Sequence, residues 1–170
     1  MRVAAQWRRS GTEERFVAAD PHEVYQVVSD VMSVGDRSDE CRSAEWLAGG
    51  QAPGQVGARF RGRNRSGLAR WSRVCEVVEA KPGVAFAFRT VPERLDLSRA
   101  DSTTWRYDLV SQDGGTLVRH SYEITKMPKQ PFRALYSVLL PQHRDMRPAM
   151  RRTLESLPAS VNARRSTRPA

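Results

Sequence analysis

The stretch that most constrains the fold is residues 57–71, where strand-like alternation runs into a glycine turn and out again to a tryptophan. Phe60, Gly62 and Asn64 fall on one face of such a strand. Gly67 lies in a polar run and supplies the positive φ that a tight hairpin connection needs. Trp71 follows on the next strand. The other face of the first strand is predicted to meet solvent, because it carries Arg59, Arg61 and Arg63.

Period-two patterns recur on both sides of this hairpin and predict a meandering antiparallel sheet. A polar loop over 36–43 is expected ahead of a short strand. Before that loop, Asp20 is placed to cap a helix, with Pro21 at its first position and Glu23 returning to the cap. The strands are expected at residues 12–18, 45–48, 59–64, 69–80, 84–91, 104–110 and 116–126.

The C-terminal region changes from period two to helical spacing. We expect a helical arm ending near Leu140 and a main helix starting near Asp145, with a stripe that includes Met150 and Leu154. Pro158 lacks a backbone donor and clashes with the preceding turn, so the main helix should end or kink there. Residues 1–162 are expected to form one domain, and residues 163–170 a basic disordered tail.

The hairpin and its surroundings resemble the START-like superfamily, also called SRPBCC or polyketide cyclase/dehydrase-type proteins. The match to the pattern Val-Gly-x-x-Phe-x-Gly-x-Asn-x-x-Gly with a following Trp involves Val56, Gly57, Phe60, Gly62, Asn64, Gly67 and Trp71. Further motifs fall in the family's order, from residues 19–25 to 114–118. The resemblance implies an α+β helix-grip fold, in which a curved antiparallel sheet wraps around a C-terminal helix with a cavity between them.

The basic composition raises the question of nucleic-acid binding, because the formal net charge is +9. Of the 28 basic residues only three are lysines, and the arginines are spread along the chain. We therefore favour a solvated basic surface over a specific nucleic-acid site. No membrane span or signal peptide is recognised, so we expect a cytoplasmic protein, with Cys41 and Cys75 as reduced thiols.

No motif for a nucleophile, a phosphate-binding loop, a dinucleotide or a metal is present, so we expect no cofactor and no metal. His22 and His143 are expected at the surface. His120 shares the alternation of the last strand and is expected to face inward, where a structural role and a catalytic role both stay open.

Aromatic residues occupy the predicted inward positions of successive strands, which suits either a filled core or a ligand cavity. Our preferred function is binding of a small hydrophobic or aromatic ligand, lipid-like or polyketide-like. The alternatives are a cyclase, aromatase or dehydrase that acts by positioning its substrate, and a protein or nucleic-acid interaction module. No catalytic residue is assigned. The predicted ligand-binding residues are Phe60, Asn64, Trp71, Phe86, Phe88, Trp105, Tyr107, His120, Tyr122 and Met150.

Overall fold

The computed structural model describes residues 6–167, and seven strands there form one antiparallel sheet in the order β1-β7-β6-β5-β4-β3-β2. The predicted strand ranges agree with the structure to within two residues, except at β2. The strands are β1 (Ser10–Val17), β2 (Cys41–Trp46), β3 (Arg59–Ser66), β4 (Ala69–Lys81), β5 (Ala85–Thr90), β6 (Ser102–Gln112) and β7 (Gly115–Lys126).

The β3–β4 hairpin confirms the predicted division of faces. Gly67 takes φ +57° at the turn, and Phe60 is the register partner of Cys75 on β4. Phe60 and Gly62 are buried, whereas the alternate arginines lie outside, where Arg59 pairs with Glu76 at 2.8 Å. The alternation therefore reports the true register, since a slip of one residue would have exchanged the two faces.

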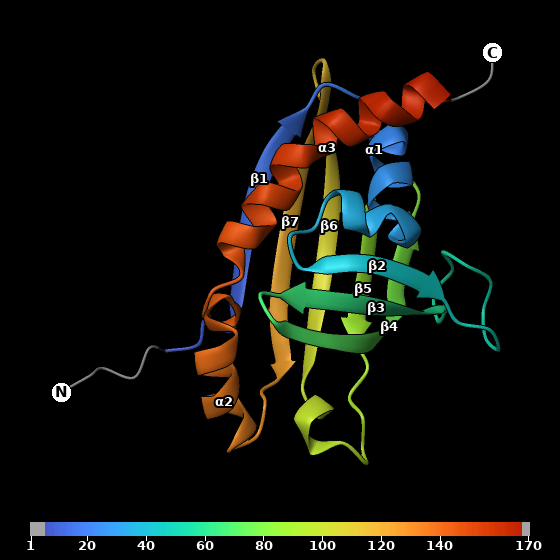
Figure 1. Ribbon diagram of the computed structural model, residues 1–170. Helices are drawn as coiled ribbons and strands as arrows, with labels where there is room; N and C mark the ends of the chain where they lie inside the picture. The colour runs from blue at the N-terminus through green and yellow to red at the C-terminus, as the bar shows by residue number, and fades with distance from the viewer. Residues whose placement is uncertain (1–5, 168–170) are drawn as a thin grey trace.

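The sheet is strongly curved, and register shifts occur at three places in it. One lies at the start of β2, one in β4 between Val77 and Glu79, and one at the start of β6 between Ser102 and Thr103. Bulges of this kind bend a strand and increase its twist. Figure 1 shows β2, β3 and β4 running across the direction of β6 and β7, so that the sheet wraps around one face.

Strand β2 corrects the sequence interpretation, which placed a strand at residues 45–48 and a loop over 36–43. The strand begins at Cys41, because the segment pairs with β3 as far as Asn64. Pairing along the edge of the sheet has overridden the weak β propensity of the polar residues there. Residues Val31–Asp36 form a 3-10 helix, η1, which lies against β2.

Helix α1 (Pro21–Val28) has the predicted start. The Asp20 carboxylate accepts the His22 backbone N–H at 2.8 Å, and the Glu23 side chain accepts the Asp20 backbone N–H at 3.1 Å. This capping box satisfies donors that a helix start leaves free. The helix buries Val24, Val27 and Val28 toward the sheet.

The C-terminal region contains α2 (Phe132–Leu139), the 3-10 helix η3 (Pro141–Arg144) and α3 (Arg147–Thr167). Helix α3 contacts β1, β7 and α1, and Figure 1 shows it lying across the open side of the curved sheet. Its buried side chains are Met150, Leu154, Leu157 and Val161. The expected curved sheet with a C-terminal helix packed on it is confirmed. No helix within residues 6–167 has the length and apolar character that crossing a membrane requires.

One expectation about α3 is narrowed and another needs correction. Of the two outcomes expected at Pro158, an end or a kink, the helix does not end there: it continues to Thr167, and Figure 1 shows its axis changing direction along its length. Residues 163–167 are therefore helical and not a disordered tail, while the last part of the predicted tail lies outside the described residues. Val161, beyond the proline, is buried in the main core, and the ion pairs of Arg164 with Asp30 at 3.0 Å and Arg165 with Glu23 at 2.7 Å add to this packing.

Candidate functional site

The aromatic residues predicted to face inward lie on the face of the sheet that α1 and α3 cover. Four of these aromatic rings and His120 are no more than 8% exposed, and Phe88 and Trp105 are partly buried. Two rows of register partners cross β5, β6 and β7, namely Phe88–Trp105–Tyr122 and Phe86–Tyr107–His120.

The rings contact one another across the strands. The imidazole of His120 stacks on the ring of Tyr107, with centroids 4.0 Å apart and planes 13° from parallel. Phe60 and Phe88 meet edge to face at 5.3 Å. Aromatic pairs in these geometries are favourable beyond the area they bury. The inner face is thus a continuous aromatic surface that crosses at least four strands.

Two hydrophobic clusters divide this surface. Phe60, Phe86 and Tyr107 belong to the main core, with Phe88 packed against it. Tyr122 and Met150 form a second cluster with Ile124, against which Trp105 packs. Asn64 and Trp71 are half-buried register partners on β3 and β4 and belong to neither cluster. The ten predicted residues are therefore brought to one face but not to one point, and their role in ligand binding stays a prediction.

His120 is a polar side chain that lies among the aromatic rings of the inner face. It is 4% exposed, and its Nδ1 is buried with no hydrogen-bond partner among residues 6–167. Burial lowers the pKa of His120 to about 3, so the ring is neutral at physiological pH. Burial also raises the pKa of the stacked Tyr107 hydroxyl to about 12, which keeps that group protonated. In contrast, the hydroxyl of Tyr122 has a hydrogen-bond partner, because it donates to the Arg8 carbonyl at 3.1 Å.

Arg73 places a charge on the same face, next to Trp71 along β4. Its guanidinium donates to the Asp101 carboxylate and to the Asp101 carbonyl, both at 2.8 Å. The buried Nε has no partner among the described residues. Cys75 continues the inward series, and burial raises the pKa of its thiol to about 12, so the sulfur is a protonated, unreactive group.

A polar cluster at the edge of this face was missed by sequence reasoning. His143 of η3 was expected to be exposed, but its side chain is 22% exposed and its Nε2 lies 2.8 Å from the Glu40 carboxylate. Gln142 donates to the same carboxylate at 3.0 Å and to the Ser66 hydroxyl at 2.9 Å. The ring of Trp71 meets His143 edge to face at 5.7 Å. No local pattern could have revealed this cluster, because its members are far apart in the sequence.

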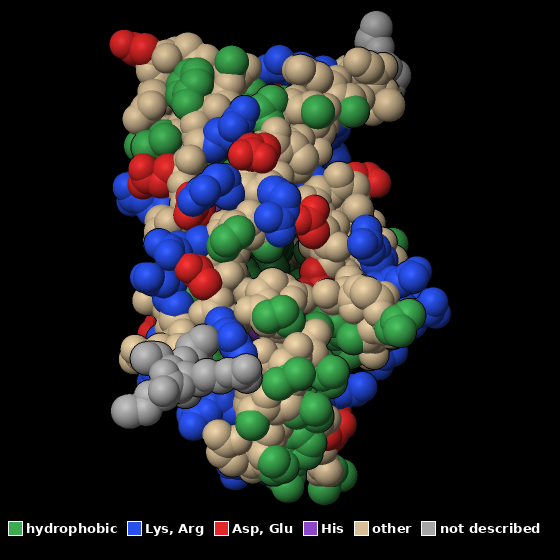
Figure 2. Space-filling view, turned by 60° about the vertical axis from the view of Figure 1, so that its left-hand side comes forward, with side chains coloured by type: hydrophobic (Ala, Val, Ile, Leu, Met, Phe, Trp, Pro, Cys, Tyr) green, Lys and Arg blue, Asp and Glu red, His purple; other side chains and the backbone are tan. Residues whose placement is uncertain are grey.

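The surface is hollowed near the middle of the face shown in Figure 2. Hydrophobic side chains lie at depth in this hollow, and Lys, Arg, Asp and Glu side chains stand around its opening. Small-molecule sites are usually concave and lined mostly by apolar side chains, with a small number of polar groups.

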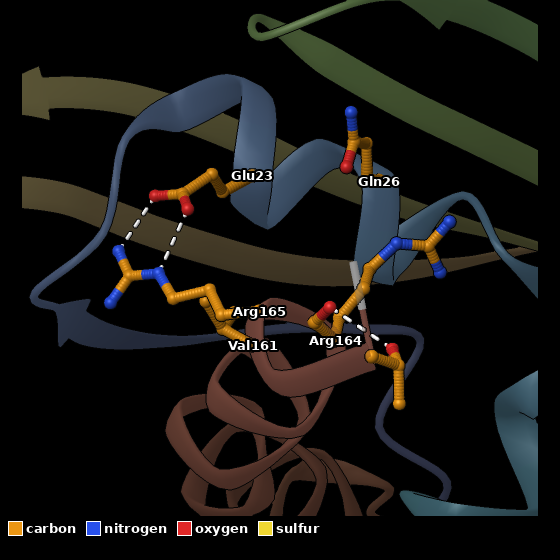
Figure 3. Close-up of a pocket in the computed structure, with 6 residues that line it drawn as sticks. Glu23, Gln26, Val161, Arg164 and Arg165 are labelled. Carbon is orange, nitrogen blue, oxygen red and sulfur yellow. Dashed lines mark hydrogen bonds and ion pairs between the residues drawn. The ribbon is translucent and has the colours of Figure 1, made fainter. Parts of the chain in front are cut away.

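A separate surface pocket lies between α1 and the last turns of α3. Figure 3 shows two nitrogens of Arg165 donating hydrogen bonds to the Glu23 carboxylate, while Arg164 extends beside Gln26. Its charged groups already have partners, because Arg165 pairs with Glu23 inside the pocket and Arg164 pairs with Asp30 outside it. This pocket is unlike the aromatic face, and we assign it no ligand. Within residues 6–167 no group of three or more His, Cys, Asp or Glu side chains could hold a metal ion.

Comparison with solved structures places the fold among proteins of similar shape and distant sequence. The aromatase/cyclase ZhuI of Streptomyces sp. R1128 superposes with a TM-score of 0.68 at 13% identity, covering 92% of this chain and 94% of that one. The protein TTHA0849 of Thermus thermophilus gives 0.67 at 18% identity, covering 91% and 98%. Ara h 8.0201 gives 0.63 at 11% identity, covering 91% and 97%. These likenesses establish the helix-grip fold.

A search among curated proteins finds no match to the sequence. The family model described as "Polyketide cyclase / dehydrase and lipid transport" matches residues 8–162, which include the whole sheet and most of α3. The chain therefore belongs to the polyketide cyclase/dehydrase and lipid transport family, as the hairpin motif suggested.

Proposed function

We propose that this protein binds a small hydrophobic or aromatic molecule between the aromatic face of the sheet and α3. The family to which the chain belongs includes lipid transport in its description, and a structural neighbour is named as an aromatase/cyclase. Both descriptions concern molecules with large apolar surfaces.

The observation that carries the proposal is unused hydrogen-bonding capacity inside an aromatic surface. His120 Nδ1 and Arg73 Nε are both buried on this face without a partner among residues 6–167. Leaving a buried polar atom unpaired costs about 1–3 kcal/mol. A protein that only filled its core would avoid that cost, whereas a bound molecule or an ordered water could supply the missing partner.

The test is the binding of a neutral apolar fluorophore, N-phenyl-1-naphthylamine, together with native mass spectrometry of the purified protein. We expect saturable binding with quenching of tryptophan fluorescence. Phe88→Ala removes a ring from the inner face and should weaken binding several-fold. Phe16→Ala is the matched control, because Phe16 lies on the outer face of β1 and is 45% exposed. Absence of both fluorophore binding and any co-purified molecule would show that the interior is a filled core.

A further inference from the structure

Arg37 is a buried cation that follows η1. It is 7% exposed, and its guanidinium donates to the Ser33 hydroxyl at 2.8 Å, the Ser33 carbonyl at 3.4 Å and the Asp30 carbonyl at 3.2 Å. These bonds use both N–H groups of Nη1 and one of Nη2. The Nε–H and the second Nη2–H have no acceptor among residues 6–167. In an arginine these two groups can together hold both oxygens of a carboxylate.

No carboxylate forms an ion pair with Arg37 within the described part of the chain. The Asp30 and Asp36 carboxylates favour its charged form from a distance, but Asp30 is itself engaged by Arg164 at 3.0 Å. Burial lowers the pKa of Arg37, which is the mark of a charge held away from water. Buried charges are normally paired, because an unpaired one is costly. Arg37 therefore lacks the paired anion that a buried guanidinium normally has within the described part of the chain.

Tyr107 of β6 packs in the same core cluster as Val31 of η1, the 3-10 helix that Arg37 follows. The guanidinium lowers the pKa of the Tyr107 hydroxyl, against the larger raising effect of burial. That hydroxyl has no hydrogen-bond partner among residues 6–167, and the ring of Tyr107 stacks on His120. The cation of Arg37 and the protonated hydroxyl of Tyr107 thus both lie on the side of the sheet where η1 and Tyr107 pack into one core. Both are donors, and a donor pair selects an oxygen that carries negative charge.

We infer that the bound molecule carries an anionic oxygen, as in a carboxylate or enolate, which binds to the guanidinium of Arg37 and the hydroxyl of Tyr107 while its apolar body lies along the aromatic rows. This inference rests on the proposed function and adds the chemical class of the ligand. The bonds of Arg37 to the Asp30 and Ser33 carbonyls hold its guanidinium in place, because they fix one edge of the group and leave the other free.

The experiment compares 1-pyrenebutyric acid with its methyl ester at pH 7.5, using fluorescence titration of the whole protein. The two probes share the same apolar body and differ in charge. We expect the acid to bind at least about 10-fold more tightly than the ester, as a charge-assisted pair in a dry site would give. Arg37→Met should bring the acid to the affinity of the ester and leave the ester unchanged. Tyr107→Phe should reduce the preference for the acid, and Arg61→Met, on the outer face, should leave both affinities unchanged.

The outcomes separate this inference from the proposed function. If neither probe binds, the proposed function fails. If both probes bind equally to the wild-type protein, or if the preference survives in folded Arg37→Met, ligand binding stands and the anionic class is overturned. Arg37→Gln keeps a donor for the Asp30 and Ser33 carbonyls and serves if Arg37→Met does not fold. If neither Arg37 variant folds, Tyr107→Phe is the deciding variant, because it keeps the ring stacked on His120 and removes only the hydroxyl. An unchanged preference of Tyr107→Phe for the acid over the ester would refute the site.

Discussion

Leu154 provides the sharpest test of how α3 is held on the sheet. Its side chain is 1% exposed within the main core, about one helical turn from the buried side chains of Met150 and Leu157. Leu154→Ala removes three carbons from this position, which is about 2.4 kcal/mol at ~0.8 kcal/mol per buried methylene. Buried neighbours on the same helix limit collapse into the space left behind, so a cavity term adds to this loss. We expect a total of about 3–5 kcal/mol.

The measurement is urea unfolding followed by far-UV circular dichroism, with the m-value as a check that the unfolding transition is unchanged. Leu139→Ala is the matched control, because Leu139 lies in a helix but is 56% exposed. It should cost less than about 1 kcal/mol, since little apolar surface leaves water there. A loss below about 0.5 kcal/mol for Leu154→Ala would refute the packing of α3 against the sheet.

Three further predictions follow from particular contacts. The pKa of His120 is about 3 in the folded protein and near 6.5 when unfolded, so the unfolded chain binds more protons between these values. Stability should fall as the pH drops through that window, by up to about 1.4 kcal/mol per pH unit, and comparison with His120→Gln should isolate this slope. Gly35→Ala should destabilise the protein, because its Cβ would lie 2.3 Å from the Arg42 carbonyl oxygen, whereas Gly50→Ala should be tolerated, since nothing lies within 4 Å; thermal unfolding checks both. Binding to duplex DNA should be weak, about 10⁻⁴–10⁻⁶ M near physiological salt, and a nanomolar complex that resists salt would contradict this.

Strand positions and facing could be predicted from the sequence because the signals are local. Alternation through Phe60 and Asn64, a positive-φ glycine at Gly67 and the capping residues around Asp20 each specify structure within a few positions. The bulge in β4 begins only after Cys75, so Arg73 shares the inward facing of Trp71 in the structure. Such features need no knowledge of distant parts of the chain.

The parts that sequence reasoning missed depend on contacts between distant segments. Glu40 meets His143 across more than a hundred residues, and neither position stands out in its own segment. Arg37 lies in a polar stretch that favours a loop, and only the packing of η1 against β2 buries it. Helix α3 passes Pro158 because the side chains on either side of it, Leu157 and Val161, are buried in the core, and this packing favours continuing the helix.

The chemistry of the inner face favours binding over turnover. A general base works best when its pKa lies near the operating pH, and burial has moved His120 well below that range. The Cys75 thiol, with a pKa raised to about 12, is not a nucleophile at neutral pH. Tyr107 keeps its proton for the same reason and can donate a hydrogen bond without giving up the proton. These groups can orient a bound molecule and complement its charge. The burial that keeps them in one protonation state also moves their pKa values away from neutral pH, so they are poor proton-transfer groups.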